Sequence, residues 1–180
     1  MRKIVCALLV MCVVTTGYSQ KFISKKGSIK FYSHTPVEDI EAVNNMAASI
    51  LNVEEGSVLV SMLVRSFTFK KELMQEHFNE NYMESDKFPK ASFKGNITNM
   101  DQIDFSKDGT YSFNVDGNIT IHGVTKPLST SGTLEINKGI PTAKTSFKVL
   151  TEDFNIAIPD LVKENIAKEI EITVEIPFAN

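Results

Sequence analysis

The 180-residue sequence has no tryptophan, only two cysteines, and no apolar run long enough to cross a bilayer. Its longest apolar run, residues 4–14, is well short of the roughly 20 residues that a membrane-spanning helix needs. Both cysteines, Cys6 and Cys12, lie within this run. If the run is removed by processing, the remaining chain has no disulfide, no thiol nucleophile and no thiolate metal site.

The N-terminal 19 residues have the three-part pattern of a cleaved secretory signal peptide. Two basic residues at positions 2 and 3 precede the apolar run, and small residues stand at positions 17 and 19. We therefore expect cleavage after Ser19, with the bond after Gln20 as the second choice. A lipoprotein cysteine at Cys12 is disfavoured, because that signal requires a small residue where Met11 stands.

Removal of residues 1–19 leaves residues 20–180 as one domain, which we expect to be secreted. About 160 residues support one substantial core but not two. Loss of two basic residues lowers Lys+Arg from 19 to 17 against 22 Asp+Glu, so the net charge moves from −3 to −5. A mildly acidic surface argues against a nucleic-acid partner, whose binding depends on clustered Lys and Arg.

Alternation of apolar and polar residues dominates the remaining sequence and predicts β-strands. In residues 111–121, Tyr, Phe, Val and Ile occupy odd positions, whereas Ser, Asn, Asp and Thr occupy even ones; residues 170–178 repeat the pattern. Weaker strands are predicted around residues 29–31, 93–97, 134–136 and 147–149. The run at residues 57–64 is apolar on both faces, which is typical of a strand covered on both sides.

Turn signals at residues 108–109, 122–123 and 138–139 separate these strands, so antiparallel neighbours are expected. Residues 70–83 have the spacing of an amphipathic helix, and residues 159–167 are a candidate for a shorter one. About eight strands and at most two helices predict a barrel or a sandwich. Composition and spacing alone do not choose between the two.

His122, in the stretch ITIHGVTKPL, is the strongest candidate for a catalytic residue. Catalysis would require a nucleophile or a metal, and an orienting partner beside the ring. Neither Thr120 nor Thr125 has a neighbouring acidic residue or the flanking glycines of a nucleophile elbow, so neither has the context of a catalytic nucleophile. We therefore interpret His122 as a hairpin residue with a hydrogen-bonded ring, Gly123 as permitting the turn, and Pro127 as placed where no ladder N–H is needed.

The other candidate sites are weaker, and we expect no catalytic and no metal site. His34 and His77 are far from His122 in the sequence, without metal-binding spacing. Paired acids such as residues 54–55 stand in polar connections, where solvated carboxylates are ordinary. Residues 104–108 lack the alternating ligands and the closing Glu of a calcium loop. The sequence therefore predicts that the protein is not an enzyme.

Two motifs resemble segments of the YceI-like family, both in their residues and in their order along the chain. They are FPKASFKGNI (residues 88–97) and GNITIHGVTKPL (residues 117–128). HFNENYMESDKFP (residues 77–89) resembles the family segment that leads into the first motif, and the resemblance spans essentially the whole mature chain. It implies a mainly β, lipocalin-like, extended eight-stranded antiparallel β-barrel with one or two short helices. It also implies a long apolar lumen that holds an isoprenoid-type lipid in the bacterial periplasm, for sequestration or transport.

The resemblance implies that the apolar faces of the strands point toward this lumen. The expected lumen residues are Phe31, Phe93, Tyr111, Phe113, Val115, Ile119, Ile121, Phe147, Ile172 and Val174. The same aromatic stripe would form the solid core of a sandwich, so a ligand-free β-sandwich interaction module of the cell envelope is the alternative. We expect an amphiphilic lipid partner and no cofactor beyond a bound isoprenoid lipid or quinone. The identity of the lipid and the formation of a homodimer stay open.

Overall fold

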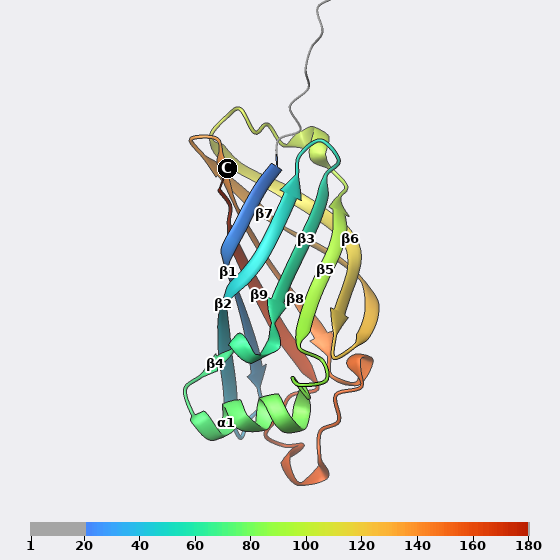
Figure 1. The fold of residues 1–180 in the computed structure, drawn as a ribbon. Helices are drawn as coiled ribbons and strands as arrows, with labels where there is room; N and C mark the ends of the chain where they lie inside the picture. Colours follow the sequence, from blue (N-terminus) through green and yellow to red (C-terminus); the bar gives the residue numbers. More distant parts are fainter. Residues whose placement is uncertain (1–20, 180) are drawn as a thin grey trace, which may run out of the picture.

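The structure is a computed structural model that describes residues 21–179, and these residues form a closed antiparallel β-barrel (Figure 1). In this part of the chain eight long strands follow the order β1-β9-β8-β7-β6-β5-β3-β2, and pairing of β2 with β1 closes the sheet. The long strands are β1 (Lys21–His34), β2 (Asp39–Asn52), β3 (Ser57–Leu63), β5 (Lys90–Ile97), β6 (Gly109–Ile121), β7 (Val124–Asn137), β8 (Ile140–Leu150) and β9 (Glu169–Pro177). A two-residue strand, β4 (Thr68–Phe69), adds to β2. The expected barrel is confirmed, and the sandwich is wrong because the sheet closes on itself instead of splitting into two layers.

Strand β6 shows how the sequence pattern produces the wall of the barrel. Phe113, Val115 and Ile119 are buried, whereas Asn114 and Asn118 are exposed. A two-residue turn joins β6 to β7, and the two strands pair along the whole length of β6. Such a short turn sets the register, and a slip by one residue would turn every apolar side chain outward.

Strand β3 differs from the expectation of a strand covered on both faces. Val58 and Val60 face the interior, but Leu59 and Leu63 on the outer face are 43% and 51% exposed. The expectation is wrong because the wall of a barrel is one layer thick, so the outer face meets solvent even where its residues are apolar.

One end of the barrel is closed by packed apolar side chains. Phe22, at the start of β1, is fully buried, and its ring stacks on that of Phe105 with 5.8 Å between centroids. The 3-10 turn η3 (Met100–Gln102) and the loop after it lie over this end (Figure 1). The barrel is therefore plugged at the end where β1 begins.

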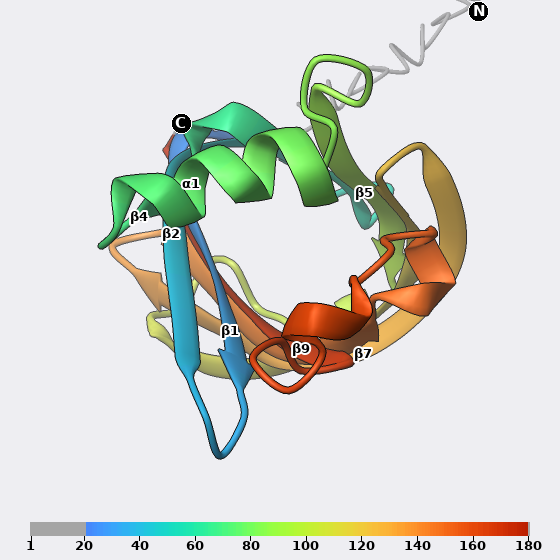
Figure 2. The same ribbon diagram turned by 90° about the horizontal axis from the view of Figure 1, so that it is seen from below.

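Two segments cover the opposite end and lie on opposite sides of it (Figure 2). The first contains the 3-10 turn η1 (Val64–Ser66), helix α1 (Glu72–His77) and the π turn η2 (Phe78–Tyr82). The second connects β8 to β9 and contains the 3-10 turns η4 (Glu152–Phe154) and η5 (Asp160–Val162). The helix expected over residues 70–83 is confirmed as α1 and η2.

The second expected helix, at residues 159–167, is wrong beyond the single turn η5. Pro159 is extended, with ψ of 143°, and the segment bonds to the β1–β2 hairpin instead of coiling. The Ala167 N–H donates to Ser33 Oγ at 2.9 Å, and the Asn165 side-chain amide donates to Glu38 at 3.4 Å. These bonds draw the β8–β9 segment across the end of the barrel.

Within residues 21–179, no helix has both the length and the apolar character that crossing a membrane requires. The expected signal peptide, residues 1–19, lies outside the described residues. Its cleavage and the resulting location of the protein therefore stay predictions.

Candidate ligand-binding cavity

The barrel encloses an apolar cavity of about 440 Å³. This volume lies within the range of small-molecule sites, about 300–1,000 Å³. Every long strand contributes to the wall, and so do α1, η2 and the β8–β9 segment. The lining reaches from Phe178 and Leu134 in the packed core to Glu38 and Val162 at the covered end. The cavity is therefore elongated along the barrel.

The structure brings nine of the ten expected lumen residues to the wall of this cavity. They are Phe31, Phe93, Phe113, Val115, Ile119, Ile121, Phe147, Ile172 and Val174. Tyr111 differs: it is half-buried, does not line the cavity, and donates its hydroxyl to the Lys107 carbonyl at 3.1 Å. The alternation placed Tyr111 on the correct face of β6 but did not reveal that the hydroxyl bonds to the preceding loop.

An aromatic cluster at the covered end extends the cavity lining beyond the residues expected from the sequence. The ring of Phe78 lies 5.4 Å from that of Phe31 and 5.0 Å from that of Phe69, between centroids. Phe67 completes the cluster, 5.3 Å from Phe31, and all four rings line the cavity. Phe67 follows the turn η1 and Phe69 lies in the two-residue strand β4, which is too short to be recognised from the sequence pattern.

Polar groups are sparse along the cavity, and one of them is without a partner. Ser49 is 2% exposed, lines the wall from β2, and its hydroxyl makes no hydrogen bond within the described structure. The hydroxyls of Thr130 and Thr145, also in the wall, lie 3.3 Å apart, and Thr145 donates to the Ser131 carbonyl. An unpaired buried hydroxyl costs free energy, so Ser49 is a site at which a polar ligand atom or a water would be stabilised.

His122 lies in the β6–β7 turn, and its ring joins that turn to both covering segments. Nδ1 is 3.0 Å from the Phe154 carbonyl, and Nε2 is 3.0 Å from Glu84 Oε2. The ring packs edge-on against Phe88, with 4.4 Å between centroids, and is 7% exposed. The hydrogen bond with His122 lowers the pKa of the Glu84 carboxyl from its ordinary 4.5, and the charge of Lys87 adds to this effect.

The turn itself requires glycine at position 123. His122 and Gly123 have φ of +50° and +74°, in the left-handed region. A Cβ on Gly123 would lie 2.5 Å from Phe88 Cε1, so a side chain would also collide with the covering segment. Pro127 lies opposite Asn118 of β6, in the part of β7 that precedes its pairing with β8 from Gly132 onward. Its missing N–H therefore stands where β7 has one neighbour, as expected.

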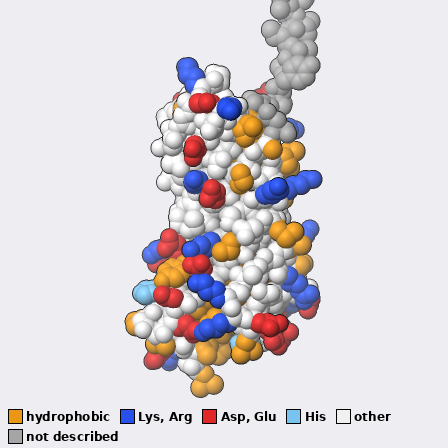
Figure 3. All heavy atoms as spheres, turned by 90° about the vertical axis from the view of Figure 1, so that its left-hand side faces the viewer, with side chains coloured by type: hydrophobic (Ala, Val, Ile, Leu, Met, Phe, Trp, Pro, Cys, Tyr) orange, Lys and Arg blue, Asp and Glu red, His pale blue; other side chains and the backbone are white. Residues whose placement is uncertain are grey.

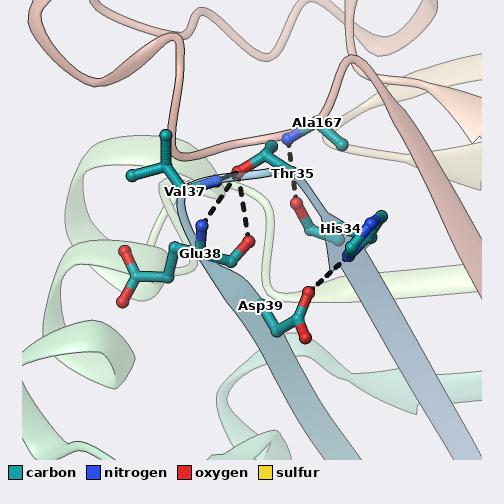
Figure 4. Close-up of polar contacts among 7 residues, drawn as sticks. His34, Thr35, Val37, Glu38, Asp39 and Ala167 are labelled. Carbon is teal, nitrogen blue, oxygen red and sulfur yellow. Dashed lines mark hydrogen bonds and ion pairs between the residues drawn. The ribbon is translucent and has the colours of Figure 1, made fainter.

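We call the covered end of the barrel the mouth and define it by residues 35–38, α1 and η5. The β1–β2 turn holds this end together. Thr35 Oγ1 accepts from the N–H groups of Val37 at 3.2 Å and Glu38 at 3.0 Å (Figure 4). The Glu38 carboxylate accepts from Lys71 Nζ at 3.2 Å and from the Asn165 amide at 3.4 Å. Glu38 therefore connects the three segments that surround the mouth.

No cluster of three or more His, Cys, Asp or Glu side chains in residues 21–179 is arranged to hold a metal ion. His34 bonds to Asp39 at 2.6 Å on the exposed surface (Figure 4), far in the sequence from the other histidines. Asp104, in the turn tested as a calcium loop, pairs instead with Lys107 at 2.8 Å. The Lys107 hydrogen bond, with those from Ser106, lowers the pKa of Asp104 to about 2. The apolar cavity is thus the feature that defines the site.

Fold and cavity together define a closed antiparallel β-barrel with an elongated apolar interior. The model of the YceI-like domain matches residues 21–178, and the chain belongs to the YceI-like family. The resemblance carried by residues 88–97 and 117–128 is thereby confirmed. The match covers nearly all of the expected mature domain.

Solved structures share this fold at low sequence identity. A polyisoprenoid-binding domain from Saccharophagus degradans superposes with a TM-score of 0.76 at 8% identity, covering 89% of this chain and 98% of that one. BcnA from Burkholderia cenocepacia gives 0.70 at 18% identity, covering 86% and 97%. The YceI protein of Campylobacter jejuni gives 0.54 at 15% identity, covering 100% and 98%. No curated protein matches the chain by sequence.

Proposed function

We propose that the protein binds an isoprenoid-type lipid in the barrel cavity and sequesters or carries it in the periplasm or outside the cell. The observation that carries this proposal is the elongated apolar cavity, to which every long strand contributes. A barrel of this size either fills with its own side chains or holds one slim ligand. The polyisoprenoid-binding domain of similar fold supports the choice of ligand class.

The lipid tail would supply most of the affinity. Burial of several hundred Å² of apolar tail at about 25 cal/mol/Å² is worth on the order of 10 kcal/mol, before the cost of association. The polar lining residues Glu38, His77 and Tyr82 belong to the segments at the mouth. A head group is therefore best accommodated at the mouth, with the tail extending toward the packed end.

Binding fits the geometry better than catalysis does. His122, which the sequence singled out, is absent from the cavity wall, and its ring nitrogens face Phe154 and Glu84. A general base must reach the proton that it removes from a bound substrate. A ring held between two structural partners outside the cavity does not meet that requirement.

The proposal is tested by extracting the protein, purified from its native host, with organic solvent and analysing the extract by mass spectrometry. We expect an isoprenoid lipid in molar proportion to the protein. A second aliquot is stripped of lipid and offered geranylgeraniol, which should be retained through gel filtration. No lipid in the native extract together with no retained geranylgeraniol would contradict the proposal.

A further inference from the structure

We infer that the mouth docks on the surface of a zwitterionic phospholipid bilayer, from which the lipid enters the cavity. This inference rests on the proposed lipid-binding function and adds to it the partner from which the ligand is taken. Three exposed apolar residues, the charges around them and their position relative to the cavity carry it.

The mouth presents apolar side chains to solvent from three segments that are distant in the sequence. Leu161 in η5 is 96% exposed, Val37 in the β1–β2 turn 61%, and Leu73 in α1 60%. We call these three the rim residues. The three segments surround the end of the barrel in Figure 2. Large apolar side chains gathered in this way mark a surface that meets a membrane or another macromolecule.

The rim is continuous with the cavity. Glu38, Met74 and Val162 each directly follow one of the rim residues in the sequence, and all three line the cavity. A lipid that left a bilayer at this surface would therefore pass from the apolar interior of the bilayer to the apolar wall of the cavity without crossing water. This continuity distinguishes the rim from Met46 and Leu59, which are exposed on the barrel wall and do not line the cavity.

The turns that carry two of the three rim residues, Val37 and Leu161, are fixed by local hydrogen bonds. The turn that carries Val37 is fixed by Thr35 Oγ1, and the turn that carries Leu161 is closed by the Val162 N–H donating to the Pro159 carbonyl at 3.0 Å. A turn whose backbone is already ordered loses less conformational entropy on docking than a disordered turn does.

The charges beside the rim are of both signs, which favours a zwitterionic surface. The charged residues that stand next to the rim residues in the sequence are Glu38, Lys70, Lys71, Glu72, Asp160, Lys163 and Glu164. At the lower end of the molecule in Figure 3, hydrophobic side chains lie among Lys, Arg, Asp and Glu. A phosphatidylcholine layer offers phosphates to the lysines and quaternary ammonium groups to the carboxylates. A purely cationic rim would instead have indicated an anionic membrane.

The experiment compares the mature protein with two double variants of equal charge change. Leu73→Glu with Leu161→Glu alters the rim, and Met46→Glu with Leu59→Glu alters the wall, where these side chains are 69% and 43% exposed. Lipid-free protein is floated with phosphatidylcholine vesicles that contain geranylgeraniol. Uptake of geranylgeraniol is then measured by extraction, both from the vesicles and from dilute ethanol without vesicles.

We expect the parent and the wall variant to float with the phosphatidylcholine vesicles and to load from them, also when the salt concentration is raised. The rim variant should load from vesicles at least about tenfold more slowly, since the burial of one leucine side chain corresponds to about that factor. It should load from ethanol at the parental rate, because neither Leu73 nor Leu161 lines the cavity.

Equal flotation and equal vesicle uptake by rim variant and parent would overturn the inference while leaving cavity binding intact. Absence of flotation by the parent would also overturn it and would assign the rim to a protein partner. Failure of the parent to load by either route would contradict the proposed function itself, and flotation would still decide whether the rim meets a bilayer.

Discussion

The Nε2 atom of His122 lies 3.0 Å from Glu84 Oε2, between residues that are 38 positions apart in the sequence. With the bond between Nδ1 and the Phe154 carbonyl, this contact ties the β6–β7 hairpin to both segments that cover the mouth. The histidine that first suggested catalysis thus holds the wall of the barrel against its cover.

His122→Ala should lower the free energy of unfolding by about 2 kcal/mol, because two hydrogen bonds are lost and the Phe154 carbonyl is left without its partner. Lipid content should be nearly unchanged, since His122 does not line the cavity. Urea unfolding and organic extraction measure the two quantities. Thr125→Ala, which removes an exposed bond to Thr120 on the same hairpin, serves as the control. Loss of all lipid from a folded His122→Ala variant would show a direct role in binding.

Acid should lower the free energy of unfolding through Glu84, which bonds to His122. Its folded pKa lies below the ordinary 4.5 because of the His122 hydrogen bond. A lowered carboxyl pKa contributes stability that is present above the unfolded value and is lost as the pH falls through the folded value. Glu84→Gln should therefore lose less stability than the parent as the pH falls below 4.5. Identical pH profiles in urea unfolding would contradict this, and Glu80→Gln, at an exposed position of η2, is the control.

Gly123→Ala should be more destabilising than Gly139→Ala. Both glycines are left-handed, with φ of +74° and +75°, so both substitutions cost about 1 kcal/mol of backbone strain. At Gly139 nothing lies within 4 Å of the added Cβ, whereas at Gly123 Phe88 Cε1 lies at 2.5 Å. The clash should add about 1–3 kcal/mol. Equal shifts in thermal unfolding would mean that Phe88 moves aside freely.

Processing of the N-terminus is tested by the intact mass of protein recovered from the native host. The signal pattern in residues 1–19 predicts a chain that starts at Gln20, or at Lys21 if cleavage follows the second choice. A mass that retains Met1, or one raised by a lipid modification, would contradict export through a cleaved signal peptide.

Sequence alternation predicted seven of the eight long strands, but it did not predict β2 (Asp39–Asn52). It indicated the inward face of the clearly alternating strands, whereas β3 was expected to be covered on both faces. Phe113, Val115 and Ile119 line the cavity because alternate residues of a strand point to the same face, and this face of β6 is the inner one. Alternation does not encode position along the barrel, and Tyr111 was therefore misplaced. Nor does it encode closure of the sheet, which depends on pairing of β1 with β2 and was anticipated from the family resemblance.

The mouth was the least predictable part of the molecule, because its structure depends on contacts between distant segments. Residues 159–167 have a pattern compatible with a helix, but their amide groups bond to Ser33 and Glu38, more than 120 positions away. Phe78 lies within residues 70–83, which were expected to form an amphipathic helix, but that pattern does not reveal the contacts of its ring with Phe31 and Phe69. Local patterns contain no information about such pairings.

The central claim, that the barrel interior holds a lipid, is tested most directly by filling the cavity from within. Val115 points into the cavity from the middle of β6, and its neighbour Asn114 points outward. Val115→Trp should occupy the space of the tail, whereas Asn114→Trp should leave it free. In a solid core the Val115 substitution would overpack and cost roughly 1–3 kcal/mol.

The deciding measurement is the molar ratio of lipid to protein in organic extracts of the parent, Val115→Trp and Asn114→Trp, accompanied by thermal unfolding of the lipid-free proteins. We expect lipid in the parent and in Asn114→Trp, little or none in Val115→Trp, and similar unfolding temperatures for all three. A strongly destabilised Val115→Trp variant, with no lipid in any extract, would contradict the account, because it would mean that the interior is packed rather than hollow.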